Sequence, residues 1–293
     1  MELSDYVTYQ KGDLPLILCS PHGGSIDIIT IPKRINFKTF KNNTLVHITP
    51  DSSSKISFVT GNDGPLTELT HLINQSIVDI TGKKPYLVIS NVIREDIDIN
   101  RPSQFGTETN EALEIWEHYF NCISDAIDLV RQEFGQGLLI DLHSYTNKPS
   151  NNNNILQIGY GMDKKLLQQL YYSRPRSPPT QSIQKKIYRE FTLRTSQTLV
   201  YPPNIENIRA LIFSKKSLGS LLTEFGLDTY PSPQYSNIDK IKNFKYYRGG
   251  YTTRLTARDI PSIQLEFSKV QLQDLERTSS IAAIAILYYL AQQ

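Results

Sequence analysis

Two histidines of this sequence stand at the ends of apolar runs. His22 comes just after Leu16–Ser20, and His143 closes the run that begins at Leu138. Apolar runs of this length predict buried strands. Buried strands of α/β proteins present polar residues at their carboxyl ends, where ligands bind. Because imidazole is a favoured zinc ligand, the pattern predicts a metal site at one edge of a sheet, and therefore an enzyme.

A catalytic zinc ion usually takes three protein ligands and one water, so two histidines call for a carboxylate. Asp63, which lies between glycines and just before a predicted helix, is the best candidate. A role as a turn residue or as the N-cap of that helix is equally open. Glu68 and Asp27 are weaker alternatives. Asp141 is interpreted as a residue that orients a metal-bound histidine, and plain structure is its alternative.

Asn100 and Arg101 follow another predicted strand, where the chain leaves the sheet. An arginine can bind a carboxylate through two parallel hydrogen bonds. The pair therefore indicates an acidic substrate group. The alternative is a surface salt bridge of Arg101 with Asp96 or Asp98.

Glu266 lies at the end of an apolar run, after the segment Gly249–Arg254. A buried carboxylate is costly unless it has a partner. Beside a zinc ion it would have one, and it could act as a general base on water.

Strand and helix patterns alternate along most of the chain. Further strands are expected at 85–90, 155–160 and 262–267, and helices at 65–81, 109–134, 182–197, 214–225 and 274–291. This alternation predicts an α/β fold with a central mixed, mostly parallel sheet flanked by helices. Residues 25–55 are predicted to be an irregular polar loop, and flexible loops are expected near 147–154 and 173–180.

The bulk composition is that of one globular domain over residues 1–293. The net charge of +2 and the scattered basic residues argue against nucleic acid or a membrane surface as a partner. Cys19 and Cys122 offer neither a disulfide framework nor a zinc-finger spacing. Neither a secretory signal nor a bilayer-spanning run is evident, so a cytoplasmic location is expected. The sequence predicts no oligomeric state.

Taken in order, the motifs resemble those of the N-formylglutamate amidohydrolase family. The matching pieces are Pro21–Gly24, Asp63 with Glu68-Leu69, Ile97–Arg101, Leu139–Ser144, Gly249–Arg254 and Gln264–Glu266. They span nearly the whole chain. That family is similar in fold to zinc carboxypeptidases and aspartoacylases, so the resemblance implies a zinc-carboxypeptidase-like fold. Gly23 stands where many members have serine, which alters the edge of the pocket.

The resemblance also implies roles for individual residues. One Zn²⁺ would be held by His22, Asp63 and His143. Glu266 would be the general base, and Arg254 would be both a catalytic and a substrate-binding residue. The remaining substrate-binding residues would be Asn100, Arg101, Gly250 and Tyr251.

The implied reaction is hydrolysis of the amide bond of a small N-acyl amino acid such as N-formylglutamate. A zinc carboxypeptidase or another deacylase with the same site is the nearest alternative. A non-catalytic binding protein of this fold is a second, although a buried Glu266 argues against it. A phosphate site at Gly23-Gly24 is a weak reading, because no lysine completes a P-loop.

Overall fold

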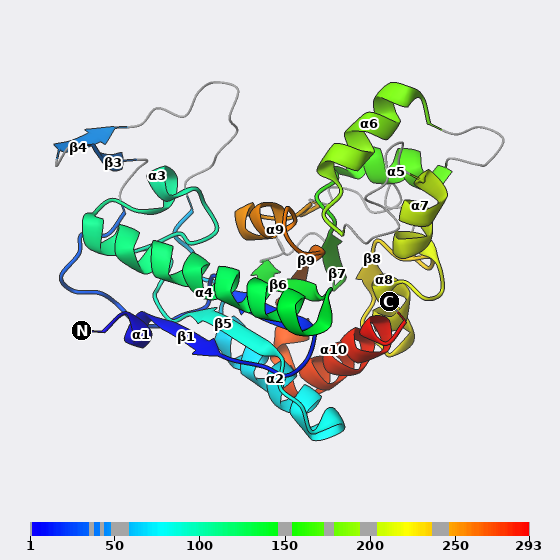
Figure 1. Cartoon of the computed structure of the whole chain (residues 1–293), viewed down its shortest axis with the longest axis horizontal. Coiled ribbons are helices and arrows are strands. Elements are labelled where there is room, and N and C mark those ends of the chain that lie inside the picture. Colours follow the sequence, from blue (N-terminus) through cyan, green and yellow to red (C-terminus); the bar gives the residue numbers. More distant parts are fainter. Residues whose placement is uncertain are drawn as a thin grey trace.

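Seven strands form one mixed sheet in the order β1-β5-β2-β6-β9-β7-β8 (Figure 1). The computed structural model describes residues 2–34, 59–145, 154–172, 179–193, 204–235 and 246–292, and the backbone alone of 38–41 and 44–47. The strands of the sheet are β1 (Val7–Gln10), β2 (Leu16–Ser20), β5 (Tyr86–Ser90), β6 (Leu138–Tyr145), β7 (Leu156–Gly159), β8 (Thr229–Tyr230) and β9 (Ser262–Ser268).

The centre of the sheet is parallel. Strands β5, β2, β6 and β9 run in the same direction, whereas β1 pairs antiparallel with β5, and β7 antiparallel with β9. Almost every residue of the four central strands is buried, because helices cover both faces of the sheet. The predicted α/β class and its mixed, mostly parallel sheet are confirmed.

Helices α2 (Leu66–Thr81), α8 (Leu218–Glu224) and α10 (Leu275–Leu290) share one hydrophobic core with one face of the sheet. The long helix α4 (Asn110–Phe134) packs on the opposite face (Figure 1). The hydroxyl of Thr109 caps its N-terminus by accepting a hydrogen bond from the Ala112 amide. The remaining helices are α1 (Leu3–Tyr6), α3 (Ser103–Gly106), α5 (Lys164–Tyr172), α6 (Gln181–Glu190), α7 (Ile205–Phe213), α9 (Tyr251–Thr256) and the short 3₁₀ turn η2 (Gln271–Gln273).

Several elements differ from the sequence-based expectation. The predicted irregular loop 25–55 contains an antiparallel strand pair, β3 (Lys38–Lys41) and β4 (Thr44–His47). The predicted helix 182–197 ends at Glu190, because the chain turns extended there and buries Phe191. Residues 147–153 and 173–178 of the two expected flexible loops lie outside the described residues. Strand β1 and helices α5, α7 and α9 were not predicted.

Both cysteines are buried free thiols, Cys19 on β2 and Cys122 on α4. Within the described part of the chain, we find no helix with the length and apolarity needed to cross a bilayer.

The α2 face gives a stability prediction. Ile73 is fully buried between the sheet and neighbouring helices, whereas Ile80 on the same helix is 54% exposed. Ile73→Ala should lower the free energy of unfolding by about 2–5 kcal/mol, because it leaves a cavity. Ile80→Ala should change it by about 0.5 kcal/mol or less. Denaturant unfolding of both variants measures this, and equal losses would contradict the packing described.

Candidate metal centre

The two histidines meet at the carboxyl edge of the central strands. Strands β2 and β6 are parallel neighbours, so the residues that follow β2 and those near the end of β6 lie side by side. The imidazole rings of His22 and His143 are both buried, with centroids 5.1 Å apart. Gly24 permits the turn after β2, because a Cβ there would come 2.1 Å from the backbone of Asn91.

Asp63 completes the group. Its Oδ2 lies 3.0 Å from Nδ1 of His143 and 3.6 Å from Nδ1 of His22. One ligand atom from each of the three residues falls within 4.8 Å of the others, and all three side chains are buried. The Ser144 amide donates to Oδ2 of Asp63 at 3.1 Å and holds the carboxylate in place.

The positions of Asp63, Glu68 and Asp27 show which of these three carboxylates lies with the two histidines. Asp63 is not the cap of α2, because Pro65 occupies the N-cap position. Glu68 is exposed on α2, and Asp27 is exposed and paired with Lys33. Asp63 is therefore the carboxylate that joins the two histidines.

Each histidine is held from behind by a second carboxylate. Nε2 of His22 lies 2.9 Å from Oδ1 of Asp98, and Nε2 of His143 lies 3.1 Å from Oδ1 of Asp141. Such pairs fix the ring and leave the other nitrogen for a metal ion. Nδ1 of His22 is buried and makes no hydrogen bond to any described residue. An unsatisfied buried nitrogen facing a carboxylate fits a metal site.

Charge at this site is nearly balanced. Burial acts to raise the pKa of Asp63, but His22 and His143 outweigh it and hold that pKa below its usual range. Burial acts to lower the pKa of His143, but Asp141 and Asp63 hold it well above its usual value. Without a metal ion His143 is thus favoured as a protonated partner of the two acids, and a divalent cation could replace that positive charge.

Arg94 was missed by the sequence reading. Its Nε and Nη2 lie 3.1 and 3.0 Å from Oδ2 of Asp98, and its Nη1 lies 3.8 Å from Oδ1 of Asp63. The guanidinium therefore neutralises the carboxylate behind His22 and also contacts the proposed ligand. Asp98 was considered only as a salt-bridge partner for Arg101. Because Arg94 and Asp98 lie in a segment without helix or strand, their spacing gave no signal of the pair.

Glu266 stands beside His143. The two residues are register partners in the parallel pair β6 and β9, so their side chains emerge on the same face of the sheet. Glu266 is buried, and its Oε1 accepts a hydrogen bond from Nε2 of Gln264. Burial raises the pKa of Glu266 to about 8; Asp63 and Asp141 add to the rise, and His143 opposes it.

Helix α9 is fastened to the same strands. Oδ2 of Asp141 accepts from the hydroxyl and amide of Thr253 at 2.7 and 3.2 Å. Oδ1 of Asn100 accepts from the Thr252 amide, and its Nδ2 lies 3.2 Å from Nε2 of His143. Gly250 must lack a side chain, because a Cβ there would come 2.2 Å from Nδ2 of the Asn100 side chain.

The predicted substrate-binding residues occupy different places. Arg101 lies 3.8 Å from Asp98, so the salt bridge weighed as its alternative is present, whereas Asp96 pairs with Lys33. The Nε of Arg254 donates to the Gly250 carbonyl at 2.9 Å, and the side chain is exposed.

Tyr251 packs against α4. Its ring centroid lies 6.1 Å from that of Trp116 and 5.8 Å from that of Phe120. This contact anchors α9 on the face of the sheet that α4 covers.

These features define a mixed α/β fold in which a buried His-Asp-His group that could hold a metal ion lies at the carboxyl edge of the parallel strands. The same fold occurs in the solved N-formylglutamate amidohydrolase of Ralstonia eutropha, with a TM-score of 0.51, 13% sequence identity and 98% of each chain covered. The similarity of the fold to this amidohydrolase, expected from the motifs, is confirmed.

Two other solved structures align over most of their length with lower scores. A gene product of Agrobacterium tumefaciens aligns with a TM-score of 0.48 and 13% identity, over 98% of this chain and 94% of that one. The N-acetylmuramyl-L-alanine amidase of Mycobacterium smegmatis aligns with a TM-score of 0.36 and 10% identity, over 95% and 97%. No protein-family model and no curated protein matches the sequence.

Removal of one histidine should remove the metal. We expect His143→Ala to lose most bound divalent metal, because a proposed ligand disappears and Oδ1 of Asp141 loses its imidazole partner. His71→Ala, which alters an exposed histidine on α2, should keep the metal content of the wild type. Elemental analysis of the purified proteins measures this. A His143→Ala protein that is folded and fully loaded would contradict the site.

The raised pKa of Glu266 gives a pH prediction for the metal-free protein. The folded state binds this proton more tightly than the unfolded chain does, so the stabilisation is present below pH 4.5 and is lost as the pH rises to about 8. In metal-free Glu266→Gln this loss is absent. The melting temperature of the variant relative to wild type should therefore rise with pH across that window, and a constant difference would contradict the burial of a titrating carboxyl.

Proposed function

We propose that this chain is a zinc-dependent hydrolase that cleaves the amide bond of a small N-acyl amino acid such as N-formylglutamate. The observation that carries the proposal is the convergence of Nδ1 of His22, Nδ1 of His143 and Oδ2 of Asp63 beside a buried glutamate. The ligand set of two imidazoles and one carboxylate is one that catalytic zinc favours. The shared fold with an N-formylglutamate amidohydrolase supports the same reading.

A zinc ion held by His22, Asp63 and His143 would supply Lewis-acid chemistry, acidifying water and polarising an amide carbonyl. Asp98 and Asp141 keep both rings oriented for this task. The remaining steps belong to side chains of the protein.

Glu266 is the proposed general base. It takes a proton from the water that attacks the carbonyl carbon, and it passes that proton to the nitrogen as the C–N bond breaks. In the metal-free protein, burial raises the pKa of Glu266 to about 8. A neighbouring zinc ion would lower that pKa and so favour the carboxylate that acts as a base near neutral pH. The products are the free acid and the free amine.

Arg101 and Arg254 divide the two remaining roles. Arg101 lies next to Asp98, and hence beside the histidine ligands, so we assign to it the stabilisation of the developing oxyanion. One well-placed donor of this kind contributes about 2.7–4 kcal/mol to the transition state. Arg254 lies on α9 and extends from the site, where it can bind a carboxylate of the substrate.

Other deacylases and zinc carboxypeptidases could use the same groups on a different amide. A panel of N-formyl amino acids, N-acetyl amino acids and dipeptides separates these candidates by the relative kcat/KM. A non-catalytic binding protein would hydrolyse none of them while retaining its metal ion.

Glu266→Gln tests the mechanism. The variant should keep its zinc, because Glu266 is not among the proposed ligands. Its kcat should fall by about 10²–10⁴-fold, because the amide of glutamine cannot accept the proton. Glu276→Gln, an exposed change at the start of α10, should leave both quantities unchanged. Turnover of Glu266→Gln at the wild-type rate would show that Glu266 is not the base.

A further inference from the structure

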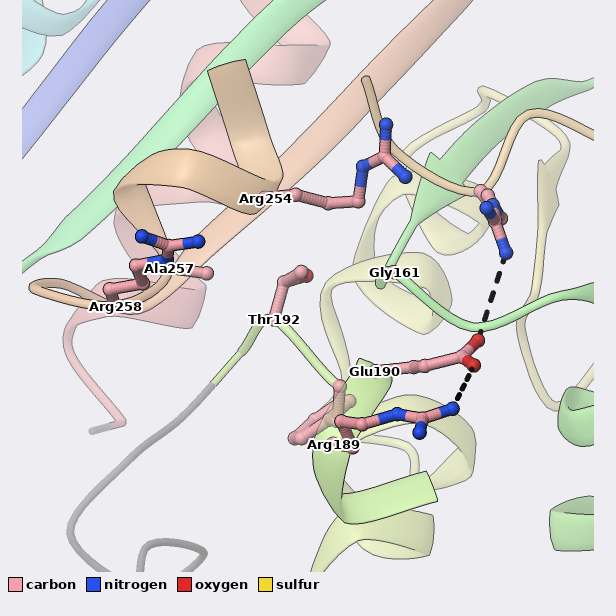
Figure 2. A pocket seen from close by; sticks show the side chains of 9 residues that line it. Gly161, Arg189, Glu190, Thr192, Arg254, Ala257 and Arg258 are labelled. Atoms are coloured by element: carbon pink, nitrogen blue, oxygen red, sulfur yellow. Dashed lines mark hydrogen bonds and ion pairs between the residues drawn. The ribbon is translucent and has the colours of Figure 1, made fainter. Parts of the chain in front are cut away.

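An arginine-lined cavity opens beside α9, outside the metal centre. Its volume is about 310 Å³, within the usual range for sites of small ligands. The polar and charged side chains that line it are Arg189, Glu190, Thr192, Arg248, Arg254 and Arg258 (Figure 2). We call this cavity the arginine pocket.

The described residues that line the arginine pocket include one carboxylate and four guanidinium groups. Glu190 lies 3.4 Å from Nη2 of Arg189 and 3.7 Å from Nη1 of Arg248, the two contacts drawn as dashed lines in Figure 2. Arg254 and Arg258 form no ion pair with a carboxylate in the described part of the chain. The pocket therefore keeps an excess of positive charge.

The surplus charge is concentrated around Arg254. Partial desolvation of the otherwise exposed side chain, and then the neighbouring charges of Arg248 and Arg101, lower the pKa of Arg254, and Glu190 opposes them. Figure 2 shows Arg254 extending from α9 towards the side of the pocket where Glu190 lies, with Arg258 at the opposite side. Like charges held this close favour a bound anion.

The hydroxyl of Thr192 is a second observation, besides the excess positive charge, that favours a ligand in the arginine pocket. The side chain is 3% exposed, and its hydroxyl makes no hydrogen bond to any described residue. Buried hydroxyl groups are normally satisfied. A ligand oxygen in the pocket would satisfy this one.

The arginine pocket is connected to the metal centre through α9. Thr253 binds Asp141, which holds His143, and the next residue along the helix is Arg254. The charge of Arg101, beside Asp98, reaches Arg254 as well. Helix α9 therefore links the arginine pocket to the residues that hold His143.

We propose that the arginine pocket binds an oxyanion group, a carboxylate or a phosphate, carried by the substrate away from the scissile amide. Arg248 and Arg254 provide the paired guanidinium donors, and the carboxylate of Glu190 competes with the anion for Arg189 and Arg248. The assignment of this anion to the substrate rests on the proposed function. The binding of an oxyanion in the pocket is independent of the proposed function.

Binding is tested by calorimetric titration of the full-length protein with inorganic phosphate and with succinate. Arg248→Gln should weaken the preferred anion by about tenfold, the loss typical of one charge-assisted contact. Glu190→Gln should tighten binding, because it removes the one carboxylate that the described residues contribute to the pocket. Arg209→Gln, which alters an arginine on α7 paired with Glu206, should have no effect.

In the wild type, added sodium chloride should weaken binding because the attraction is electrostatic. Unchanged affinity in Arg248→Gln, weaker binding in Glu190→Gln, or salt-independent binding would overturn the proposal. The salt series keeps the test decisive if a variant does not fold.

Hydrolysis then separates the two sources of the anion and the two proposals. If the natural group is a carboxylate, Arg248→Gln should lower kcat/KM about tenfold for N-formylglutamate. If the natural group is a phosphate, the same variant should lower kcat/KM about tenfold for N-formyl-O-phosphoserine instead. N-formylalanine, which lacks a second anion, should be unaffected. Equal losses on all three substrates would overturn the assignment to the substrate. Anion binding without hydrolysis of any substrate would refute the proposed function and leave the oxyanion site standing.

Discussion

The pairing of each buried imidazole with a carboxylate behind it is the constraint on which the site depends. Asp98 behind His22 and Asp141 behind His143 turn both Nδ1 atoms towards Asp63. A lone buried histidine could rotate or could satisfy either nitrogen elsewhere. With Nε2 beside an acid, the other nitrogen of each ring, Nδ1, is directed at the same oxygen of Asp63, at 3.0 Å from His143 and 3.6 Å from His22.

This concentration of buried charge is tolerated because every group has a partner. Three aspartates surround two histidines, and Arg94 contacts both Asp98 and Asp63. Unpaired, each of these charges would cost several kcal/mol to bury. Asp141 does two tasks at once, since one oxygen holds His143 and the other holds the first turn of α9. The helix that carries Arg254 is thereby positioned by the same residue that orients a histidine.

The sequence reading succeeded where the side chain lies on a strand or just after one. His143 and Glu266 are register partners on adjacent parallel strands, and the apolar residues next to each of them predicted both strands. It was weaker where the chain has no regular structure. Asp63 lies in an irregular stretch, so its role as a ligand or as a helix cap could not be separated. Arg94 and Asp98 also lie in an irregular segment after β5, and their pairing was missed because no periodicity marks it.

The sequence by itself determined the α/β class, the buried central strands and the polar residues that those strands deliver to one edge. These follow from local rules, since an apolar run and the residue that ends it are neighbours along the chain. Only the tertiary structure decided which carboxylate completes the group, that Asp98 is the acid behind His22, and how the arginines gather beside α9. Those choices join residues such as His22 and Asp98, or Glu190 and Arg248, that are far apart in sequence. The physical reason is that the order of strands in the sheet sets these distances, and hydrophobic periodicity carries no information about that order.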